Sequence, residues 1–298
     1  MGVKSRITRL RNSKSILNLL FIPVLLLLFF FIIYPFIRGT IISFTNWNGY
    51  SQHYKYVGLD KYALLFSDKD IVGTIINTII YAIGSTIFLN VMGLFYALLL
   101  DKKIRGSNVV RTIIYLPVMI SGLIIGYIWY FIVQFDGGAI NDIAAWLGHQ
   151  PLDLLTQGKL TVLLITAINV LQYVGFSMIL YLAGLQTIPK DYFEAAAIDG
   201  AKGFSQFRSI TLPLLMPSVT INIVLNIIGG LKLFDVIIAL TGGGPGYMTQ
   251  SLSTMMYQLY FSRQDAGQAA ALGDLMFFII TVISITTLVV LRKKEVEY

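Results

Sequence analysis

The chain alternates long apolar stretches with short polar ones. Six segments are long and apolar enough to cross a bilayer core about 30 Å thick, which takes about 20 residues per helix. They lie at roughly 16–37, 72–100, 110–133, 160–184, 214–240 and 270–291. The pattern therefore predicts an all-α membrane protein with six transmembrane helices, built as a single domain over residues 1–298.

The composition supports a membrane protein. Hydrophobic residues make up 56% of the chain and charged residues 12%, and the mean hydropathy is +0.75. One soluble core of this size could not bury so much apolar surface, so the lipid bilayer is the expected solvent. The first apolar segment follows basic residues as a signal peptide does, but it is too long and has no small-residue cleavage site before Thr45. We expect it to be retained.

Lysines and arginines predict the orientation, because positively charged loops stay on the cytoplasmic side. With six spans, fifteen basic residues fall on one side and six on the other. The fifteen are Lys4, Arg6, Arg9, Arg11, Lys14, Lys102, Lys103, Arg105, Arg111, Lys190, Lys202, Arg208, Arg292, Lys293 and Lys294. Both termini are therefore predicted to be cytoplasmic, in a plasma or inner membrane. The formal net charge of +7 reflects mostly this bias and requires no nucleic-acid partner.

The cytoplasmic loop at 185–213, between spans four and five, contains a polar helix signal. Asp191 lies in the first turn after Pro189, and Gly200 stands where a helix-ending glycine belongs. We expect a short helix over 190–199, then an amphipathic run that Pro213 ends before span five. On composition alone, this loop either only connects two spans or presents its small, alanine-rich face to another protein.

The loop also carries a spaced motif, Glu-Ala-Ala, three residues, Gly, nine residues, Ile-x-Leu-Pro. It resembles the signature loop of ABC importer permeases, and stretches such as YPFIRGTIISFTNWNG, RTIIYLPVMISGLIIGYIW and FDVIIALTGGGPG resemble the maltose-type carbohydrate branch of that family. The resemblance implies the type I permease fold, in which this loop is a coupling helix that docks on a separate ATPase. The coupling residues it implies are Glu194, Ala195, Ala196, Asp199, Gly200, Ile210, Leu212 and Pro213.

The resemblance also implies the partners of the chain. They are a second permease subunit, two ATPase subunits, an extracytoplasmic solute-binding protein and a sugar substrate. The sequence has no G-x-x-x-x-G-K-[ST] phosphate loop, and we read the glycine-rich run at 241–246 as a tight turn, so ATP hydrolysis is expected on another chain. The chain has no cysteine, and His53 and His149 lie in separate outer loops, so neither a metal nor a cofactor is expected.

Polar residues within the predicted spans are candidates for the solute path, because burying them in lipid is costly. Amides and aromatic rings bind sugars, but amides also tie membrane helices together, and both roles remain open. The candidates are Asn169, Gln172, Tyr173, Asn222 and Asn226. Lys232 and Asp235 are three residues apart on one predicted helix, and we expect an ion pair between them rather than solute contact.

Two alternative functions remain at this point. The same machinery could import another solute, such as an amino acid, phosphate or a peptide. A self-contained transporter driven by an ion gradient would need acidic residues in several spans or two inverted halves with broken helices. We find no repeat, and Lys232 and Asp235 are the only charged residues that the pattern places deep within a span. An ion-driven mechanism is therefore the less favoured alternative.

Overall fold

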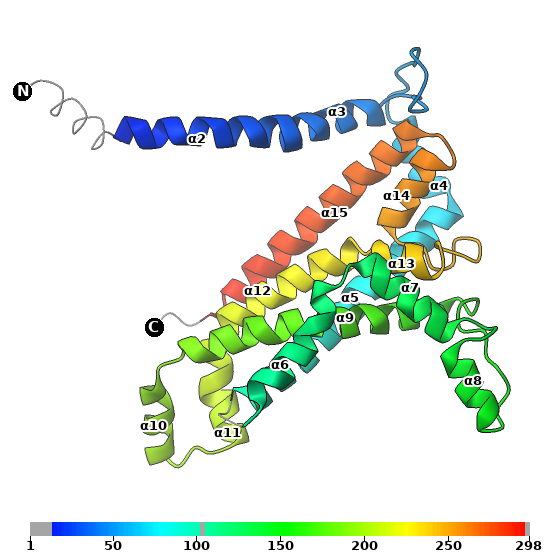
Figure 1. Ribbon diagram of the computed structural model, residues 1–298. Helices are drawn as coiled ribbons and strands as arrows, with labels where there is room; N and C mark the ends of the chain where they lie inside the picture. The colour runs from blue at the N-terminus through cyan, green and yellow to red at the C-terminus, as the bar shows by residue number, and fades with distance from the viewer. Residues whose placement is uncertain (1–13, 102–104, 296–298) are drawn as a thin grey trace, which may run out of the picture.

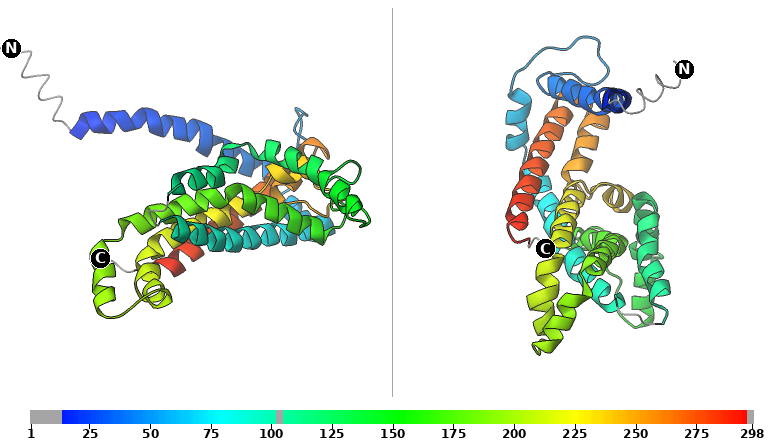
Figure 2. Two further views of the ribbon diagram at one scale, coloured as in Figure 1. Left: turned by 60° about the horizontal axis from the view of Figure 1, so that its bottom comes forward. Right: turned by 90° about the vertical axis from the view of Figure 1, so that its left-hand side faces the viewer.

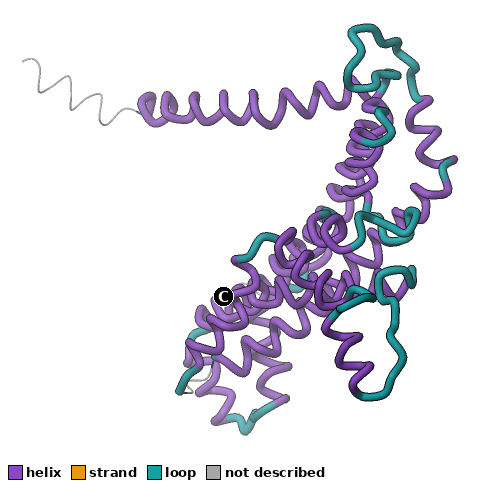
Figure 3. The backbone as a smooth tube through the Cα atoms, turned by 45° about the vertical axis from the view of Figure 1, so that its right-hand side comes forward, coloured by secondary structure: helices purple, strands orange, loops and turns teal. Residues whose placement is uncertain are grey.

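The computed structural model describes residues 14–101 and 105–295, with side chains described from Phe21 onward. Within these ranges every regular element is helical, and loops join the helices (Figure 3). The pairing of Thr45 with Tyr56 is an isolated bridge outside any strand. The all-α prediction is confirmed. The basic residues at 4–11, together with Lys102 and Lys103, lie outside the described residues.

Five helical stretches are long and apolar enough to cross a membrane without a sharp bend. They are Phe21–Ser43, Lys69–Leu100, Lys159–Thr187, Phe204–Thr241 and Ala266–Arg292. The elements that form them are α2 (Lys14–Leu28), the π-helical turn η1 (Phe29–Ile33), α3 (Tyr34–Ser43), α5 (Lys69–Leu100), α9 (Lys159–Thr187), α11 (Phe204–Gln206), the π-helical turn η3 (Phe207–Thr211), α12 (Leu212–Leu231), α13 (Asp235–Leu240) and α15 (Ala266–Arg292). These stretches match five of the six predicted spans.

The third predicted span is bent rather than straight. It consists of α6 (Ser107–Tyr115), the 3₁₀ turn η2 (Leu116–Met119) and α7 (Gly122–Val133), with an angle of 97° between its two parts. Ile120 and Ser121 have extended ψ angles of 137° and 140°, which break the helix. The second part, α7, then packs on α13, where a Cβ added at Gly126 would lie 2.5 Å from Ala239 Cβ.

The predicted helix break at Pro213 is wrong. The chain stays helical from α11 through η3 into α12, and Pro213 lies in the first turn of α12. Proline is tolerated in a first turn because its missing N–H is not needed there, and the preceding π-helical turn changes the hydrogen-bond spacing. The fifth span is instead interrupted at residues 232–234, between α12 and α13.

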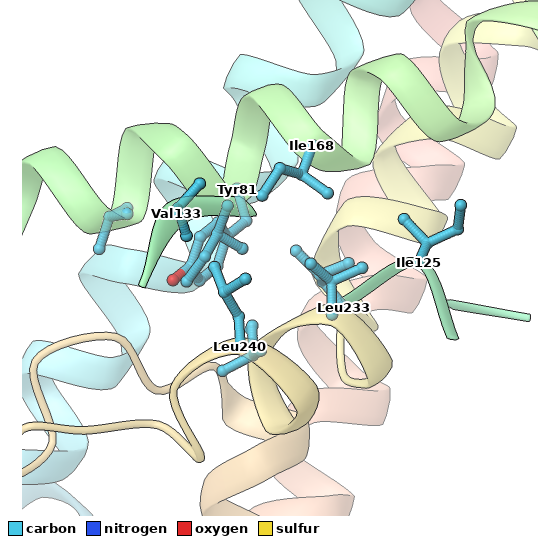
Figure 4. Packing of buried hydrophobic residues seen from close by; sticks show 10 residues of the cluster. Tyr81, Ile125, Val133, Ile168, Leu233 and Leu240 are labelled. Carbon is cyan, nitrogen blue, oxygen red and sulfur yellow. The ribbon is translucent and has the colours of Figure 1, made fainter. Parts of the chain in front are cut away.

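Helices α5, α9 and α12 pack together at the centre of the bundle (Figures 1 and 2). One apolar cluster joins α5, α7, α9 and α13 through Tyr81, Val133, Ile168 and Leu240 (Figure 4). This cluster holds α7 and α13 against one end of the long helices. The interruption of the fifth span is therefore fixed by packing on both sides.

Helices α2 and α3 form an arm that projects away from the bundle (Figures 1 and 2). Only the α3 end contacts the rest, chiefly α15, where the rings of Phe36 and Phe277 lie 4.7 Å apart. None of the apolar window of this arm is buried within the chain. The start of α2 and the end of α15 lie toward the end of the bundle that holds α10 (Lys190–Ile198), on the left of Figure 1.

The opposite end of the bundle carries three short helices, which the sequence analysis treated only as loops. They are α4 (Asp60–Ser67), α8 (Ala139–Trp146) and α14 (Leu252–Phe261). The glycine-rich run forms the predicted tight turn between α13 and α14, with left-handed backbone at Gly242, Gly243 and Gly246. Tyr81 of α5 donates a hydrogen bond to the Thr249 carbonyl (2.8 Å), which ties this turn to the bundle.

Candidate functional site

The polar helix predicted between spans four and five is α10. Asp191 lies in its first turn, where a negative charge favours the helix N-terminus. The helix ends in a Schellman motif, in which the Ala201 N–H donates to the Ala196 carbonyl (2.8 Å). Gly200 supplies the left-handed residue of this motif, with a φ of +81°. A residue with a side chain would be strained in this backbone conformation. The predicted helix and its glycine end are confirmed.

Helix α10 has an anchored face and an open face. Phe193 packs against an apolar cluster at the ends of α5, α9 and α12, and Ala196 is only 4% exposed. Glu194 and Ala195 are exposed, and Ile198 is 87% exposed. The helix is thus held to the bundle on one side. Its other side offers a carboxylate, a small residue and a large apolar residue.

The remaining residues of the motif flank this helix. Asp199 and Gly200 are exposed at its C-terminal end. Ile210 is half-buried and packs against the same cluster as Phe193. Leu212 and Pro213 are half-buried in the first turn of α12. The second half of the motif therefore fixes the return of the chain into the bundle. In the first half, Glu194 and Ala195 lie on the open face, whereas Ala196 lies on the anchored face.

A cavity of about 640 Å³ lies between the bend of the third span, α9, α12 and α13. Four of the five candidate solute residues line it, namely Asn169, Gln172 and Tyr173 of α9 and Asn226 of α12. Asn222 does not line the cavity, because it is fully buried between α12 and α9. The structure thus gathers four of the candidates at one place, and Asn222 lies outside the lining of this cavity.

The four candidate amides, including Asn222, also tie parts of the bundle together. The bonds are Asn169 Nδ2 to Ser85 Oγ (2.9 Å), Gln172 Nε2 to the Ile120 carbonyl (3.0 Å), Asn222 Nδ2 to the Ser177 carbonyl (3.1 Å) and Asn226 Nδ2 to Ser177 Oγ (3.1 Å). Tyr173 differs, because it is 37% exposed and makes no hydrogen bond within the described part of the chain. Asn169, Gln172 and Asn226 therefore combine both roles considered from the sequence. Asn222 only ties α12 to α9, and Tyr173 only lines the cavity.

The predicted ion pair between Lys232 and Asp235 is not formed among the described residues. The prediction assumed one continuous helix, but α12 ends at Leu231 and α13 begins at Asp235. Both charged side chains are exposed within this chain and line the cavity. The break in the fifth span therefore adds one positive and one negative group to the cavity wall.

A half-buried network was not predicted from the sequence, although an acid within an apolar segment was a signal for it. Asp274 of α15 accepts hydrogen bonds from Thr40 Oγ1 (3.0 Å) and the Tyr62 hydroxyl (2.8 Å). Burial and the hydrogen bond to Asp274 raise the pKa of Tyr62, outside the spans in α4, so its hydroxyl stays protonated. The network joins α3, α4 and α15, and it fixes the base of the projecting arm.

No three histidine, cysteine, aspartate or glutamate side chains come together in the described part of the chain to hold a metal ion. The arrangement instead provides a surface helix and a polar cavity, which suit docking and solute passage.

Comparison with known proteins identifies relatives over most of the chain. Residues 89–293 match the family described as "Binding-protein-dependent transport system inner membrane component". The probable starch degradation products transport system permease protein AmyD of Thermoanaerobacterium thermosulfurigenes is 37% identical over 92% of this chain and 93% of that protein. The trehalose/maltose transport system permease protein MalF of Thermococcus litoralis is 33% identical over 92% of each.

A solved structure has the same fold. One chain of a bacterial ABC transporter involved in the import of the acidic polysaccharide alginate superposes with a TM-score of 0.82 at 24% identity. The match covers 98% of this chain and 99% of that one. The predicted ABC importer permease fold is confirmed.

Proposed function

The chain belongs to the family of binding-protein-dependent transport system inner membrane components, and on that premise we propose that it forms half of the pathway of a sugar importer. As a permease of this family it is a multi-pass membrane protein and a non-catalytic subunit, which works with a solute-binding protein. The energy comes from two ATPase subunits on separate chains, and one of them docks on α10. The open face of α10 is the observation that carries this proposal.

A second permease subunit completes the pathway. The arm formed by α2 and α3 supports this proposal, because it stands away from the bundle and buries none of its apolar window. Leu25, Phe30 and Phe31 are each more than half exposed along it. Lipid covers part of such a helix, and small or apolar contacts from a neighbouring subunit cover the rest.

The solute is proposed to be a sugar or an oligosaccharide. Relatives named for starch products, for multiple sugars and for trehalose and maltose support this class over amino acids, phosphate or peptides. The cavity supports it too, because it combines the ring of Tyr173 with amides and the charged groups of Lys232 and Asp235. Rings and amides are the groups that bind sugar faces and hydroxyls.

Replacing Tyr173 with Ala should raise the sugar concentration at half-maximal uptake by about two- to tenfold, since an aromatic contact is worth about 0.5–1.5 kcal/mol. The fold should persist, because Tyr173 makes no hydrogen bond within the described residues. Uptake is measured in cells with a panel of labelled sugars, amino acids and phosphate. Tyr127→Ala is the matched control, because Tyr127 is exposed on α7 and lies outside the cavity. Equal effects of both variants, or uptake of a non-sugar only, would contradict the sugar proposal.

Both termini and α10 are proposed to face the cytoplasm. The chain has no native cysteine, so single cysteines can be placed at the exposed positions Gln150 and Ser205. In intact cells, an impermeant thiol reagent should label position 150 and leave position 205 unlabelled until the cells are lysed. Labelling of position 205 before lysis would reverse the orientation and remove α10 from the side that contains ATP.

A further inference from the structure

A second polar cavity, of about 790 Å³, lies beside α10 and is separate from the solute cavity. It is bounded by Asp101 directly after α5, the start of α6, the end of α9 and the start of α10. Its charged lining residues are Asp101, Arg105, Arg111 and Lys190. The cavity therefore lies at the level where two spans, α5 and α9, leave the membrane.

The charges around this cavity are mostly positive and unpaired. Arg105, Arg111 and Lys190 face one acid, Asp101, and none of the three forms an ion pair among the described residues. Arg111 donates one hydrogen bond from Nη2 to the Leu100 carbonyl, and its Nε is buried without a partner. Three cations that no carboxylate neutralises make the cavity attractive to an anion.

Two helix N-termini add to this charge. Helix α6 begins at the lining residues Ser107 and Asn108, and α10 begins at Lys190. The first N–H groups of a helix have no partner within the helix, and the helix dipole favours a negative group there. Arginine side chains and free N–H groups together are the donors that phosphate oxygens accept.

We propose that this cavity binds a phosphate group carried by a larger molecule, and that the bound phosphate links α6 to α10. A phosphate fits better than a carboxylate, because its several oxygens can accept from donors on different sides of the cavity. The volume exceeds the needs of a bare ion, and the lining also contains the apolar residues Leu185, Ile188 and Phe193. A membrane phospholipid headgroup and a soluble phosphate ester share this chemistry.

The test uses the purified full-length chain in detergent. Native mass spectrometry measures binding of dioleoylphosphatidylglycerol and, separately, of glycerol 3-phosphate. The variant Arg105→Gln/Lys190→Gln should weaken binding about thirty-fold, since each cation near a lipid headgroup is worth about 1 kcal/mol. Arg111 is left in place because it bonds the Leu100 carbonyl. The control Lys202→Gln/Arg208→Gln removes two exposed charges near α10 that lie outside the cavity, and it should bind as the wild type does.

The two ligands distinguish the source of the phosphate. If the lipid binds and glycerol 3-phosphate does not displace it, the site is assigned to a lipid headgroup. If both ligands bind, the site is assigned to soluble phosphates. In either case, hydrogen exchange of residues 190–198 should slow on binding in the wild type and not in the cavity variant. Equal weakening by both variants would indicate general charge attraction and overturn the site. If neither ligand binds, and less ATPase co-purifies with the cavity variant but not with the control variant, the phosphate site is overturned. The cavity would then be a contact surface for a protein.

Discussion

Cells that carry Glu194→Lys should lose sugar uptake by more than about tenfold, although the chain stays in the membrane at its normal level. Glu194 is exposed on the open face of α10 and makes no hydrogen bond or ion pair among the described residues. An exposed substitution of this kind changes folding stability by about 0.5 kcal/mol or less. In a docked complex, by contrast, the reversed charge places like charges together or breaks a contact, which costs several kcal/mol. Uptake of labelled sugar, with immunoblots of the membrane fraction, measures both quantities.

Asp136→Lys is the control for this variant. It makes the same change of charge at an exposed position between α7 and α8, which lie at the end of the bundle opposite α10. It should reduce neither the amount of the chain nor the amount of ATPase that co-purifies with it. If Glu194→Lys cells take up sugar normally, α10 is only a connector between two spans, as its composition alone allowed.

The coupling loop was predictable because its signals are local. Asp191 in a first turn and Gly200 after a run of helix formers specify the start and the end of α10 without any tertiary contact. The structure adds which face is buried. Phe193 and Ala196 turn inward, and Ile198 turns outward, because the ends of α5, α9 and α12 lie on one side only. Sequence periodicity over nine residues could not assign these faces.

The interruptions of the third and fifth spans were missed for a different reason. Hydropathy measures how apolar a segment is and carries no information on its direction. Residues 112–133 contain no charged residue and are mostly apolar, yet the chain turns by 97° near Ser121. The partner that stabilises this turn is α13, which lies more than a hundred residues away in the sequence. The same contact interrupts the fifth span, and so it places Lys232 and Asp235 in the cavity wall instead of on one helix.

The close packing of α5 on α12 depends on a glycine whose replacement should strongly destabilise the bundle. A Cβ added at Gly230 would lie 2.5 Å from the Ala82 Cα and 3.1 Å from the Tyr81 carbonyl oxygen. Both are backbone atoms of α5, so no side chain can move aside to make room. The two helices would have to separate along the centre of the bundle, where α5 also packs on α9.

Gly230→Ala should therefore lower stability by about 1–3 kcal/mol, which is the usual cost of overpacking. The neighbouring Gly229 provides the matched control, because a Cβ added there meets nothing within 4 Å. Gly229→Ala should leave stability unchanged or raise it by about 0.5–1 kcal/mol, since alanine favours a helix over glycine. The thermal unfolding midpoints of both purified variants in detergent measure the difference. Equal midpoints would mean that α5 and α12 do not approach each other this closely. The position of Asn226, which lines the solute cavity from the same helix, would then also be wrong.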